Sequence, residues 1–423
     1  MIHKVGLSSF FIILCTMLVS QNSSKGNLVI VGGGLENNNQ SIFNQMIDLA
    51  GGTDKATFAV IPSASGVSVQ SFEYFKKALI SYGVKQEKIN LIPIAMVDDD
   101  STTDVNEATW KDNGYDLQLA EKVRKCTAVW FSGGDQMRTM KCLVQPDGTK
   151  TPVLDAVWEV FNNGGVVGGT SAGAAIMSEA MIGGGNSLGA LTLGVIENYG
   201  GEDFPEGEGV LLTNGLGFFP LGIVDQHFDA RARIGRLIMV LFHEKEKFET
   251  GFGIDENTAL IYLGKENKLK VAGAGGVTII NTHDAGIEYH KKLPHISNLL
   301  VSYLEDGDYY DIPTKNIYPA NGKKATVGNE YYNIKNPGKT GILAGNLSGF
   351  SELITKNLID NRGANQVENL SFYENDRGFL VKLSKTSQSA GFYTDKPDGN
   401  DHYTVINISM DILPVVVKIS LLK

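Results

Sequence analysis

Ser171 is the residue whose surroundings most directly suggest chemistry. Gly169 and Gly173 bracket it two residues away on each side, which is the G-x-S-x-G spacing of a nucleophile elbow. Side chains at the bracketing positions would clash in so tight a turn. The apolar run before Ser171 and the small residues Ala174 to Met181 after it predict a strand, a sharp turn and a helix, with the Ala172 amide free to stabilise an oxyanion. Because the pattern is short and recurs by chance, a glycine-rich turn that packs or binds an anion is the alternative.

A histidine follows 56 residues later in a dense polar cluster. The apolar run Leu216 to Val224 is expected to be a strand, and it leads into Asp225, Gln226 and His227. A histidine at a strand end is more often a satisfied polar residue than a functional one. Three arginines shortly after it make this histidine a stronger candidate, although at 100° per residue they cannot share one helix face: Arg231, Arg233 and Arg236.

Two adjacent carboxylates, Asp255 and Glu256, complete the set of candidates. Adjacent residues of an extended segment point in opposite directions, so only one of the two can face a given site. A serine, a histidine and an acid, each near a strand end, are what nucleophilic acyl transfer requires. The histidine removes the serine proton, the acid fixes the histidine tautomer and backbone amides hold the oxyanion.

Strands and helices alternate through the part of the chain that would position these residues. Short apolar runs predict strands, and apolar residues at helical spacing between them predict helices of about ten residues. Thr151 and Pro152 form a helix start just before the strand that carries Ser171. This rhythm predicts a mostly parallel α/β sheet with helices on both faces. The triple glycine Gly32-Gly33-Gly34 is an incomplete and weak dinucleotide-binding signal.

Four segments in this order resemble the cyanophycinase family, serine peptidases of the peptidase E group with a class I glutamine-amidotransferase-like sheet. The resemblance extends from Asn27 to about Pro319, and its segments are Phe131 to Gln136, Gly168 to Ala174, Asp225 to Phe228 with the arginines after it, and Gly253 to Ala259. It implies a three-layer α/β/α sandwich with a mostly parallel, flavodoxin-like sheet in residues 27–320. Residues 321–423 would be a β-rich C-terminal extension, either a small appendage or added strands at the edge of the main sheet.

The resemblance also implies an activity. Members of this family cut cyanophycin, a poly-aspartate backbone that carries arginine on each side chain, into β-aspartyl-arginine dipeptides through an acyl-enzyme. The catalytic residues implied are Ser171, His227 and Glu256, with an oxyanion hole at Gly134 and Ala172. Substrate-binding residues would be Gln136, Asp225, Gln226, Arg231, Arg233 and Arg236. No cofactor and no metal are implied.

Two alternative functions remain open at this point. One is an aspartyl or isoaspartyl dipeptidase of the peptidase E type, because a long loop at 183–208 and a divergent opening at 32–37 could reshape the substrate pocket. The other is an inactive peptide-binding protein of the same fold, in which Ser171 would lie out of hydrogen-bonding reach of His227. A glutamine amidotransferase is disfavoured because the elbow carries serine and has no cysteine near it.

Composition bounds the remaining questions. The 423 residues carry a formal net charge of -10, which argues against a nucleic-acid partner.

Lys4 and the apolar run Val5 to Val19 predict a signal peptide over residues 1–24, and hence a secreted or periplasmic protein without stable membrane insertion; an uncleaved anchor is the alternative. Cys126 and Cys142 could pair or remain buried thiols. The sequence leaves the oligomeric state open, a homodimer included.

Overall fold

The computed structural model describes residues 26–199, 204–335, 337, 339–344, 349–374, 376–395 and 401–418. The signal peptide expected at residues 1–24 lies outside the described residues. In the described part of the chain, no helix is both long and apolar enough to cross a membrane.

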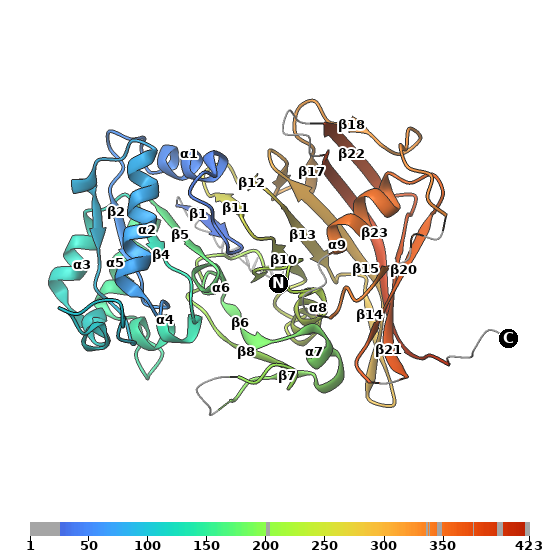
Figure 1. The fold of residues 1–423 in the computed structure, drawn as a ribbon, viewed down its shortest axis with the longest axis horizontal. Coiled ribbons are helices and arrows are strands. Elements are labelled where there is room, and N and C mark those ends of the chain that lie inside the picture. Colours follow the sequence, from blue (N-terminus) through green and yellow to red (C-terminus); the bar gives the residue numbers. More distant parts are fainter. Residues whose placement is uncertain are drawn as a thin grey trace, which may run out of the picture.

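A nine-stranded sheet forms the half of the molecule that carries Ser171 (Figure 1). Five neighbouring strands run parallel, in the order β1 (Asn27–Val31), β5 (Val166–Thr170), β4 (Ala128–Phe131), β2 (Phe58–Ile61) and β3 (Ile89–Leu91). Beyond β1 the sheet continues with antiparallel strands β11 (Thr258–Leu263), β12 (Lys268–Gly273), β16 (Tyr309–Asp311) and β17 (Asn316–Tyr318). The predicted α/β architecture with a parallel sheet is therefore confirmed, with an antiparallel extension at one edge.

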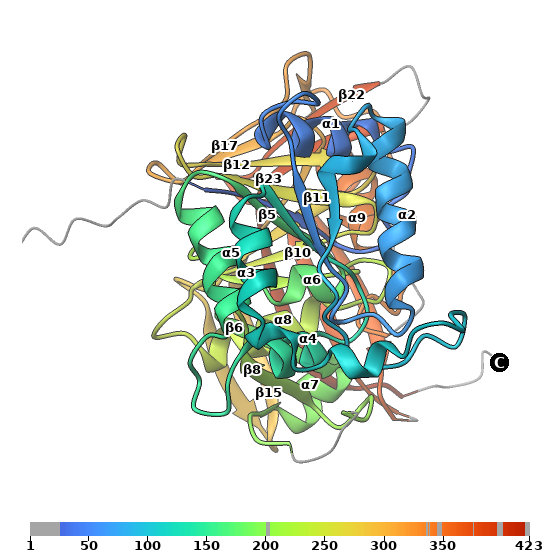
Figure 2. The ribbon, with the colours of Figure 1, turned by 90° about the vertical axis from the view of Figure 1, so that its left-hand side faces the viewer.

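Helices cover both faces of this sheet, as Figure 2 shows. Alternate strand residues point to opposite faces, so Leu28 and Ile30 join one core with α3 (Leu117–Arg124) and α5 (Pro152–Asn162). Val29 and Val31 join the other core with α1 (Gln40–Leu49) and α2 (Ser68–Ser81). Helix α5 begins as predicted, because the Thr151 side chain accepts a hydrogen bond from the Leu154 amide and Pro152 occupies the first turn.

A second sheet, of eleven strands, forms the other half of the molecule. It begins at β9 (Ile223–Asp225) and β10 (Thr250–Ile254), continues through β13 (Gly276–Asn281) and β15 (Leu293–Glu305), and then takes in the strands of the C-terminal segment. These are β23 (Asp401–Val416), β21 (Arg377–Ser384), β20 (Gln366–Phe372) and β19 (Lys339–Thr340), with β14 (Gly286–His290), β18 (Lys324–Ala325) and β22 (Ala390–Asp395) paired alongside.

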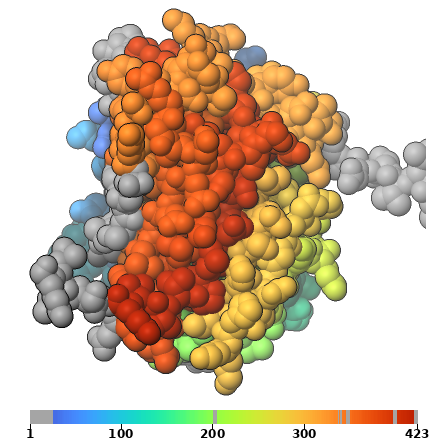
Figure 3. Space-filling view, turned by 90° about the vertical axis from the view of Figure 1, so that its right-hand side faces the viewer, coloured from blue at the N-terminus to red at the C-terminus, as the bar shows by residue number. Residues whose placement is uncertain are grey.

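The C-terminal segment is thus neither a separate appendage nor an extension of the parallel sheet. Its longest strand, β23, pairs with β15, so backbone hydrogen bonds join the two sides of residue 320. Its strands cover most of the face drawn in Figure 3, beside the β14–β15 hairpin. On the inner side of this sheet, α8 (Ile234–His243) and α9 (Phe350–Ile354) contribute to one shared hydrophobic core.

The stretch 183–208, expected to be a long loop, contains regular structure over its described residues. Strand β6 (Ala180–Gly185) leads to α7 (Ser187–Leu193), whose first turn is capped by the Asn186 side chain. Strands β7 (Val195–Ile196) and β8 (Val210–Asn214) then pair in a small sheet with β6. The helix expected over Ala174 to Met181 is correspondingly shorter, because α6 spans only Ala172–Ala175 and the chain turns into β6.

The remaining helical elements are α4 (Gln136–Leu143), the short turns Gln86–Lys88, Glu107–Trp110 and Asn113–Tyr115, and a π-helical turn over Thr355–Ile359. Cys126 and Cys142 are not joined; both are buried free thiols. Burial raises the pKa of each to about 11, which makes them unreactive at neutral pH.

Candidate active site

Ser171 occupies the sharp turn between β5 and α6. Its backbone has φ 54° and ψ −111°, a left-handed conformation that is rare for a residue with a side chain. The bracketing glycines are required sterically: a Cβ at Gly169 would lie 2.6 Å from the Gly173 carbonyl oxygen, and one at Gly173 would lie 2.4 Å from the Phe131 carbonyl oxygen. The predicted strand, tight turn and helix are therefore present at this serine.

His227 and Glu256 lie in line with the serine. The Ser171 Oγ is 2.8 Å from His227 Nε2, and His227 Nδ1 is 2.5 Å from Glu256 Oε1. His227 lies two residues after the end of β9, and Glu256 lies in the turn between β10 and β11. This arrangement has the geometry in which a histidine can deprotonate a serine while an acid orients the histidine. The inactive peptide-binding alternative predicted that Ser171 would lie beyond hydrogen-bonding reach of His227, and the observed distance differs from that prediction.

The glycine turn Gly32–Gly34 at the end of β1 holds both the histidine and the acid. The His227 amide donates to the Gly32 carbonyl at 2.6 Å, and the Asn257 amide donates to the Gly33 carbonyl at 2.7 Å. A Cβ at Gly33 would lie only 2.2 Å from His227 Cε1 and 2.4 Å from Nε2. The weak dinucleotide signal is therefore explained differently: glycine here allows the imidazole to lie directly against the backbone.

Asp255 points away from the imidazole, as the alternation argument required of one of the two acids. Its carboxylate accepts hydrogen bonds from the amides of Asp229 and Gly276 and from the Tyr303 hydroxyl, each at 3.1 Å. Burial, and secondly the nearby charge of Asp229, raise the pKa of Asp255 to about 7. Glu256, whose side chain is 46% exposed, is the acid in contact with His227.

Burial lowers the pKa of His227 below its usual 6.5, because the charged imidazolium loses solvation in this position. The hydrogen bond to Glu256 acts in the opposite direction, and the positive charges of Arg231 and Arg233 lower the pKa further. The net effect keeps the imidazole neutral at physiological pH, the form that can accept a proton from Ser171.

Two cavities meet at Ser171. The polar cavity, of about 360 Å³, opens on one side, and a wider cavity of about 790 Å³, with aromatic walls that include Tyr74 and Trp130, opens on the other. Ser171, Gly134 and Arg231 line both. A substrate that spans the nucleophile would therefore have one part in each cavity.

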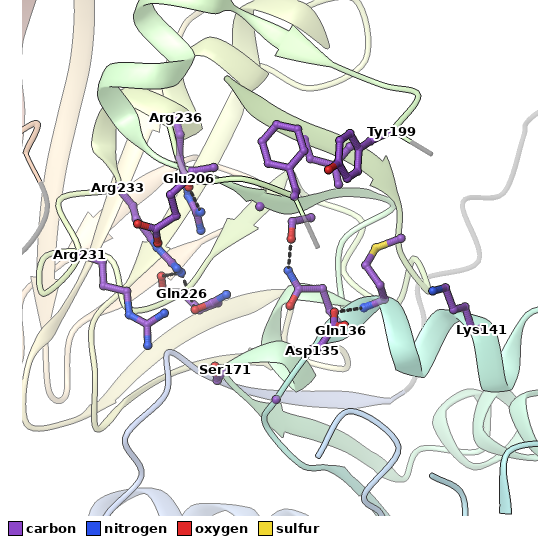
Figure 4. A pocket seen from close by; sticks show the side chains of 17 residues that line it. Asp135, Gln136, Lys141, Ser171, Tyr199, Glu206, Gln226, Arg231, Arg233 and Arg236 are labelled. Atoms are coloured by element: carbon purple, nitrogen blue, oxygen red, sulfur yellow. Dashed lines mark hydrogen bonds between the residues drawn. The ribbon is translucent and has the colours of Figure 1, made fainter. Parts of the chain in front are cut away.

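Charged groups of both signs line the polar cavity (Figure 4). The three arginines lie together on one side, Asp135, Gln136 and Lys141 on the opposite side, and Ser171 lies at the base. Glu206 lies beside the arginines, close enough for its charge to favour the charged form of Arg233. Burial, and secondly the charge of Arg236, nevertheless lower the pKa of Arg233 to about 9.

Five of the six residues predicted to bind substrate line this cavity: Gln136, Gln226, Arg231, Arg233 and Arg236. They differ in how far they are already engaged. Gln136 donates to the Ile182 and Gly183 carbonyls, and Arg233 donates to the main-chain and side-chain oxygens of Gln226. Arg231 is exposed, and within the described residues its guanidinium has no hydrogen-bonding or ion-pair partner, so it is the arginine most available to a ligand.

Asp225, the sixth, does not lie on the cavity wall formed by the described residues. Its side chain is 1% exposed and forms a bidentate ion pair with Arg236, with contacts of 2.8 Å and 2.5 Å. Arg236 Nη1 donates in addition to the Gly185 carbonyl at 2.6 Å. A buried carboxylate needs a partner, and Arg236 supplies it, so Asp225 lies behind the cavity wall; its role in substrate binding stays a prediction.

Of the two amides expected to stabilise an oxyanion, that of Ala172 directly follows the serine, and Gly134 lines both cavities together with Ser171. Ala172 is the first residue of α6, where an amide has no acceptor within the helix. Gly134 lies between β4 and α4, three residues after the end of β4 and beside Gly133, whose added Cβ would be 3.3 Å from the Ser171 Cβ. Gly134 has φ +138°, and a Cβ there would lie 2.0 Å from the Ala64 carbonyl oxygen, so the close packing of these turns depends on glycine.

The sequence reasoning missed several residues of the polar cavity. Asp135, Lys141, Tyr199, Phe204 and Glu206 all line it. Tyr199 and Phe204 form an edge-to-face pair, with ring centroids 5.1 Å apart. No periodicity in the glycine-rich stretch marked Tyr199, Phe204 or Glu206, whereas Asp135 lay within the segment Phe131 to Gln136 but was given no role.

Groups that could hold a metal lie away from this site. Among the described residues, two surface groups bring their ligand atoms within 4.8 Å of one another: Glu288, His290 and His295 on the β14–β15 hairpin, and Glu197, His243 and Glu244 near the end of α8. None of these six residues lines either cavity at Ser171.

Comparison with known proteins gives a consistent set of similarities. The profile of peptidase family S51 matches residues 28–270. A cyanophycinase from Geminocystis herdmanii (strain PCC 6308) is 32% identical over 297 residues, which cover 69% of this chain and 95% of that protein. A cyanophycinase from Synechococcus elongatus is 31% identical over 306 residues, covering 70% of this chain and 83% of that protein. A peptidase of known structure from an acI-B1 Actinobacterium is 20% identical, with a TM-score of 0.46 over 69% of this chain and 98% of that one.

Proposed function

The chain belongs to peptidase family S51 and is a serine-type peptidase, and on that premise we propose that it hydrolyses cyanophycin. The bonds cut would be those that release β-aspartyl-arginine dipeptides, and the catalytic residues would be Ser171, His227 and Glu256. Two relatives, of which the match covers 95% and 83%, carry the name cyanophycinase, which supports this substrate.

The observation that carries the proposal is the continuous contact from Glu256 through His227 to Ser171 at the point where two cavities meet. In the first step His227 Nε2 accepts the Ser171 hydroxyl proton as Oγ attacks the scissile carbonyl carbon. Glu256 stabilises the imidazolium that forms, and the amides of Gly134 and Ala172 are assigned to the oxyanion. His227 then returns the proton to the leaving amine, which departs.

An acyl-enzyme on Ser171 remains after this step. Water enters, His227 accepts one of its protons, and the resulting hydroxide attacks the ester carbonyl. Collapse of the second tetrahedral intermediate breaks the bond to Ser171 Oγ, which recovers its proton from the imidazolium. Each proton that His227 accepts is thus returned within the same half of the reaction, and the enzyme ends in its initial state.

The charges of the polar cavity fit a substrate unit that carries both signs. A β-aspartyl-arginine unit has carboxylates and a guanidinium. Arg231 and Arg233 can bind a carboxylate, while Glu206 and Asp135 offer carboxylate acceptors to a guanidinium. A cavity of about 360 Å³ is in the range of small-ligand pockets, which favours release of a short product from a chain end.

The test is incubation of the mature protein with cyanophycin granules, with mass spectrometry of the soluble products. Release of β-aspartyl-arginine by the wild type, and its absence with a folded Ser171→Ala variant, is the expected result. Release at equal rates by both proteins would refute the assignment of the nucleophile.

If neither protein releases a dipeptide from the granules, the assignment of cyanophycin as the substrate is refuted. The assay then turns to aspartyl and isoaspartyl dipeptides. A silent dipeptide panel would favour the peptide-binding alternative. We also propose export of the protein from the cytoplasm, on the basis of the charged and apolar start of the chain alone; N-terminal sequencing of protein secreted by an expression host tests this.

A further inference from the structure

Asp229, two residues after His227, connects the active-site turn to the C-terminal segment. Its Oδ1 accepts hydrogen bonds from the amides of Gly349 and Phe350, at 3.0 Å and 2.9 Å. Its Oδ2 accepts from the Ser351 amide and hydroxyl, at 3.2 Å and 2.7 Å. One half-buried carboxylate thus takes four donors at the start of α9, about 120 residues further along the chain.

The backbone of Asp229 is held from the opposite direction. Its amide donates to Asp255 Oδ1 at 3.1 Å, and Asp255 Oδ2 in turn accepts from the Gly276 amide on β13 and the Tyr303 hydroxyl on β15. Asp255 directly precedes Glu256, the acid that contacts His227. Asp229 is therefore bonded on one side to the turn that carries the acid and on the other to α9.

The turn around His227 needs such support because it is strained. His227 has φ 47° and Ala232 has φ 49°, conformations that are unfavourable for residues with a side chain and persist only where surrounding contacts hold them in place. Within the turn, the Ala232 amide donates to the Asp229 carbonyl and the Arg233 amide to the Phe228 carbonyl, both at 3.0 Å. These local bonds do not themselves attach the turn to the rest of the molecule.

Helix α9 is a firm attachment point. Phe350, Leu353 and Ile354 are at most 3% exposed and belong to the same hydrophobic core as α8 and strands β15 and β23. A displacement of α9 would thus disturb a packed core, the same core that holds Phe228 of the His227 turn. The C-terminal segment lies beyond residue 270, where the match to peptidase family S51 ends.

From these contacts we propose that Asp229 is a positioning residue, through which α9 of the C-terminal segment holds His227 in line with Ser171. The segment beyond the family match then has a role in catalysis without touching the substrate. This inference rests on the proposed function for its role in cyanophycin hydrolysis, while its structural content concerns only the Ser171–His227 alignment.

The experiment compares Asp229→Ala with Asp116→Ala in the full-length mature protein. Asp116 is a matched control because it also caps a helix, accepting from the Gln118 and Leu119 amides at the start of α3. Two readouts need no peptide substrate. One is the rate at which a fluorophosphonate probe reacts with Ser171. In this reaction Oγ bonds to phosphorus, fluoride leaves and His227 accepts the serine proton. The other is hydrogen–deuterium exchange over residues 226–233.

For Asp229→Ala we expect at least about a tenfold loss in both the fluorophosphonate rate and kcat, with a smaller change in KM, since even a displacement of about 1 Å at a catalytic group is costly. Exchange should become faster at the His227 amide, which donates to Gly32. Asp116→Ala should leave both readouts at the wild-type level. If Asp229→Ala does not fold, Asp229→Asn, which retains the Oδ1 acceptor, and Ser351→Ala, which removes a single bond, are expected to give intermediate effects.

Wild-type rates and exchange in the folded Asp229 variants would overturn the inference, whatever the substrate proves to be. Losses of equal size in the Asp116 control would overturn it too, because they would indicate general destabilisation. If the wild type releases nothing from cyanophycin but the two substrate-independent readouts change as expected, the proposed function fails while the inference stands.

Discussion

Replacing Gly33 by alanine should inactivate the enzyme without unfolding it. The new Cβ would lie 2.2 Å from His227 Cε1 and 2.4 Å from Nε2, whereas ordinary contact begins at 3.4 Å. The imidazole, or the glycine turn that it lies against, must therefore shift by about 1 Å. Since Nε2 is only 2.8 Å from Ser171 Oγ, a shift of this size breaks the hydrogen bond through which the serine is deprotonated.

The expected loss in kcat is roughly a hundredfold, the usual consequence of misplacing a catalytic group by about 1 Å. A second effect of the substitution is backbone strain, because Gly33 has φ +108° and a side chain in the left-handed region costs about 1–2 kcal/mol. Gly52→Ala separates the two effects: Gly52 has φ +80°, but a Cβ there would meet nothing within 4 Å. Both variants should lose similar stability, and only Gly33→Ala should lose activity.

The assay is release of β-aspartyl-arginine under saturating and limiting substrate, together with the fluorophosphonate rate and thermal unfolding of all three proteins. Gly33→Ala with wild-type kcat and a wild-type fluorophosphonate rate would refute the argument that glycine is needed to make room for the imidazole. An equal loss of activity in Gly52→Ala would show instead that backbone strain, and not the steric contact, is the cause.

Three further outcomes are expected. Glu256→Gln should lower kcat by up to roughly 10⁴-fold, as loss of the orienting acid does in such triads, and should do so far more than Asp255→Asn; a larger loss for the Asp255 change would reverse the assignment. The fluorophosphonate rate should fall on acidification with a midpoint below 6.5, because neutral His227 is the proposed base and its pKa is lowered. Arg231→Gln should move that midpoint upward by removing a cation that lowers the pKa of His227; a downward shift would contradict this. Folding raises the pKa of Asp255 from 3.8 to about 7. Its contribution to the free energy of unfolding should therefore be largest below pH 4 and be lost as the pH rises to about 7. Denaturant titrations of Asp255→Asn should accordingly show a flatter pH dependence of that free energy than the wild type over this window.

Local patterns predicted the parts of the site that depend on local structure. The elbow at Ser171 follows from two glycines at fixed spacing, and the start of α5 follows from Thr151 and Pro152, because the turn and the cap are formed by residues within a few positions of one another. The alternation of an extended chain likewise predicted that Asp255 and Glu256 would diverge. Which of the two meets His227 was available only from the resemblance.

Contacts between distant segments could not be predicted in this way. Gly33 and His227 are 194 positions apart, so nothing in the local sequence of the triple glycine indicates that an imidazole will lie against it. The ion pair between Asp225 and Arg236 could not be predicted for a similar reason: it depends on where β9 meets α8, not on the composition of the cluster. Side chains buried together in this way have no periodic signature.

The C-terminal segment shows the same limit. Residues 321–423 were expected to be rich in strands, and the described part of this segment contains β20, β21, β22 and β23. The longest of these strands, β23, spans 16 residues. The partner of β23 is β15, about 100 residues earlier, and strand patterns do not specify which strands pair.

The proposed triad draws its members from two sheets. Ser171 follows β5 of the parallel sheet, His227 follows β9 of the second sheet, and Glu256 lies where the chain crosses from β10 of the second sheet to β11 of the first. The second sheet in turn is completed by strands as late as β23, which ends at Val416. During synthesis, the nucleophile therefore leaves the ribosome about 245 residues before the last strand that supports its base. We expect a growing chain to remain without peptidase activity until almost its whole length has been made.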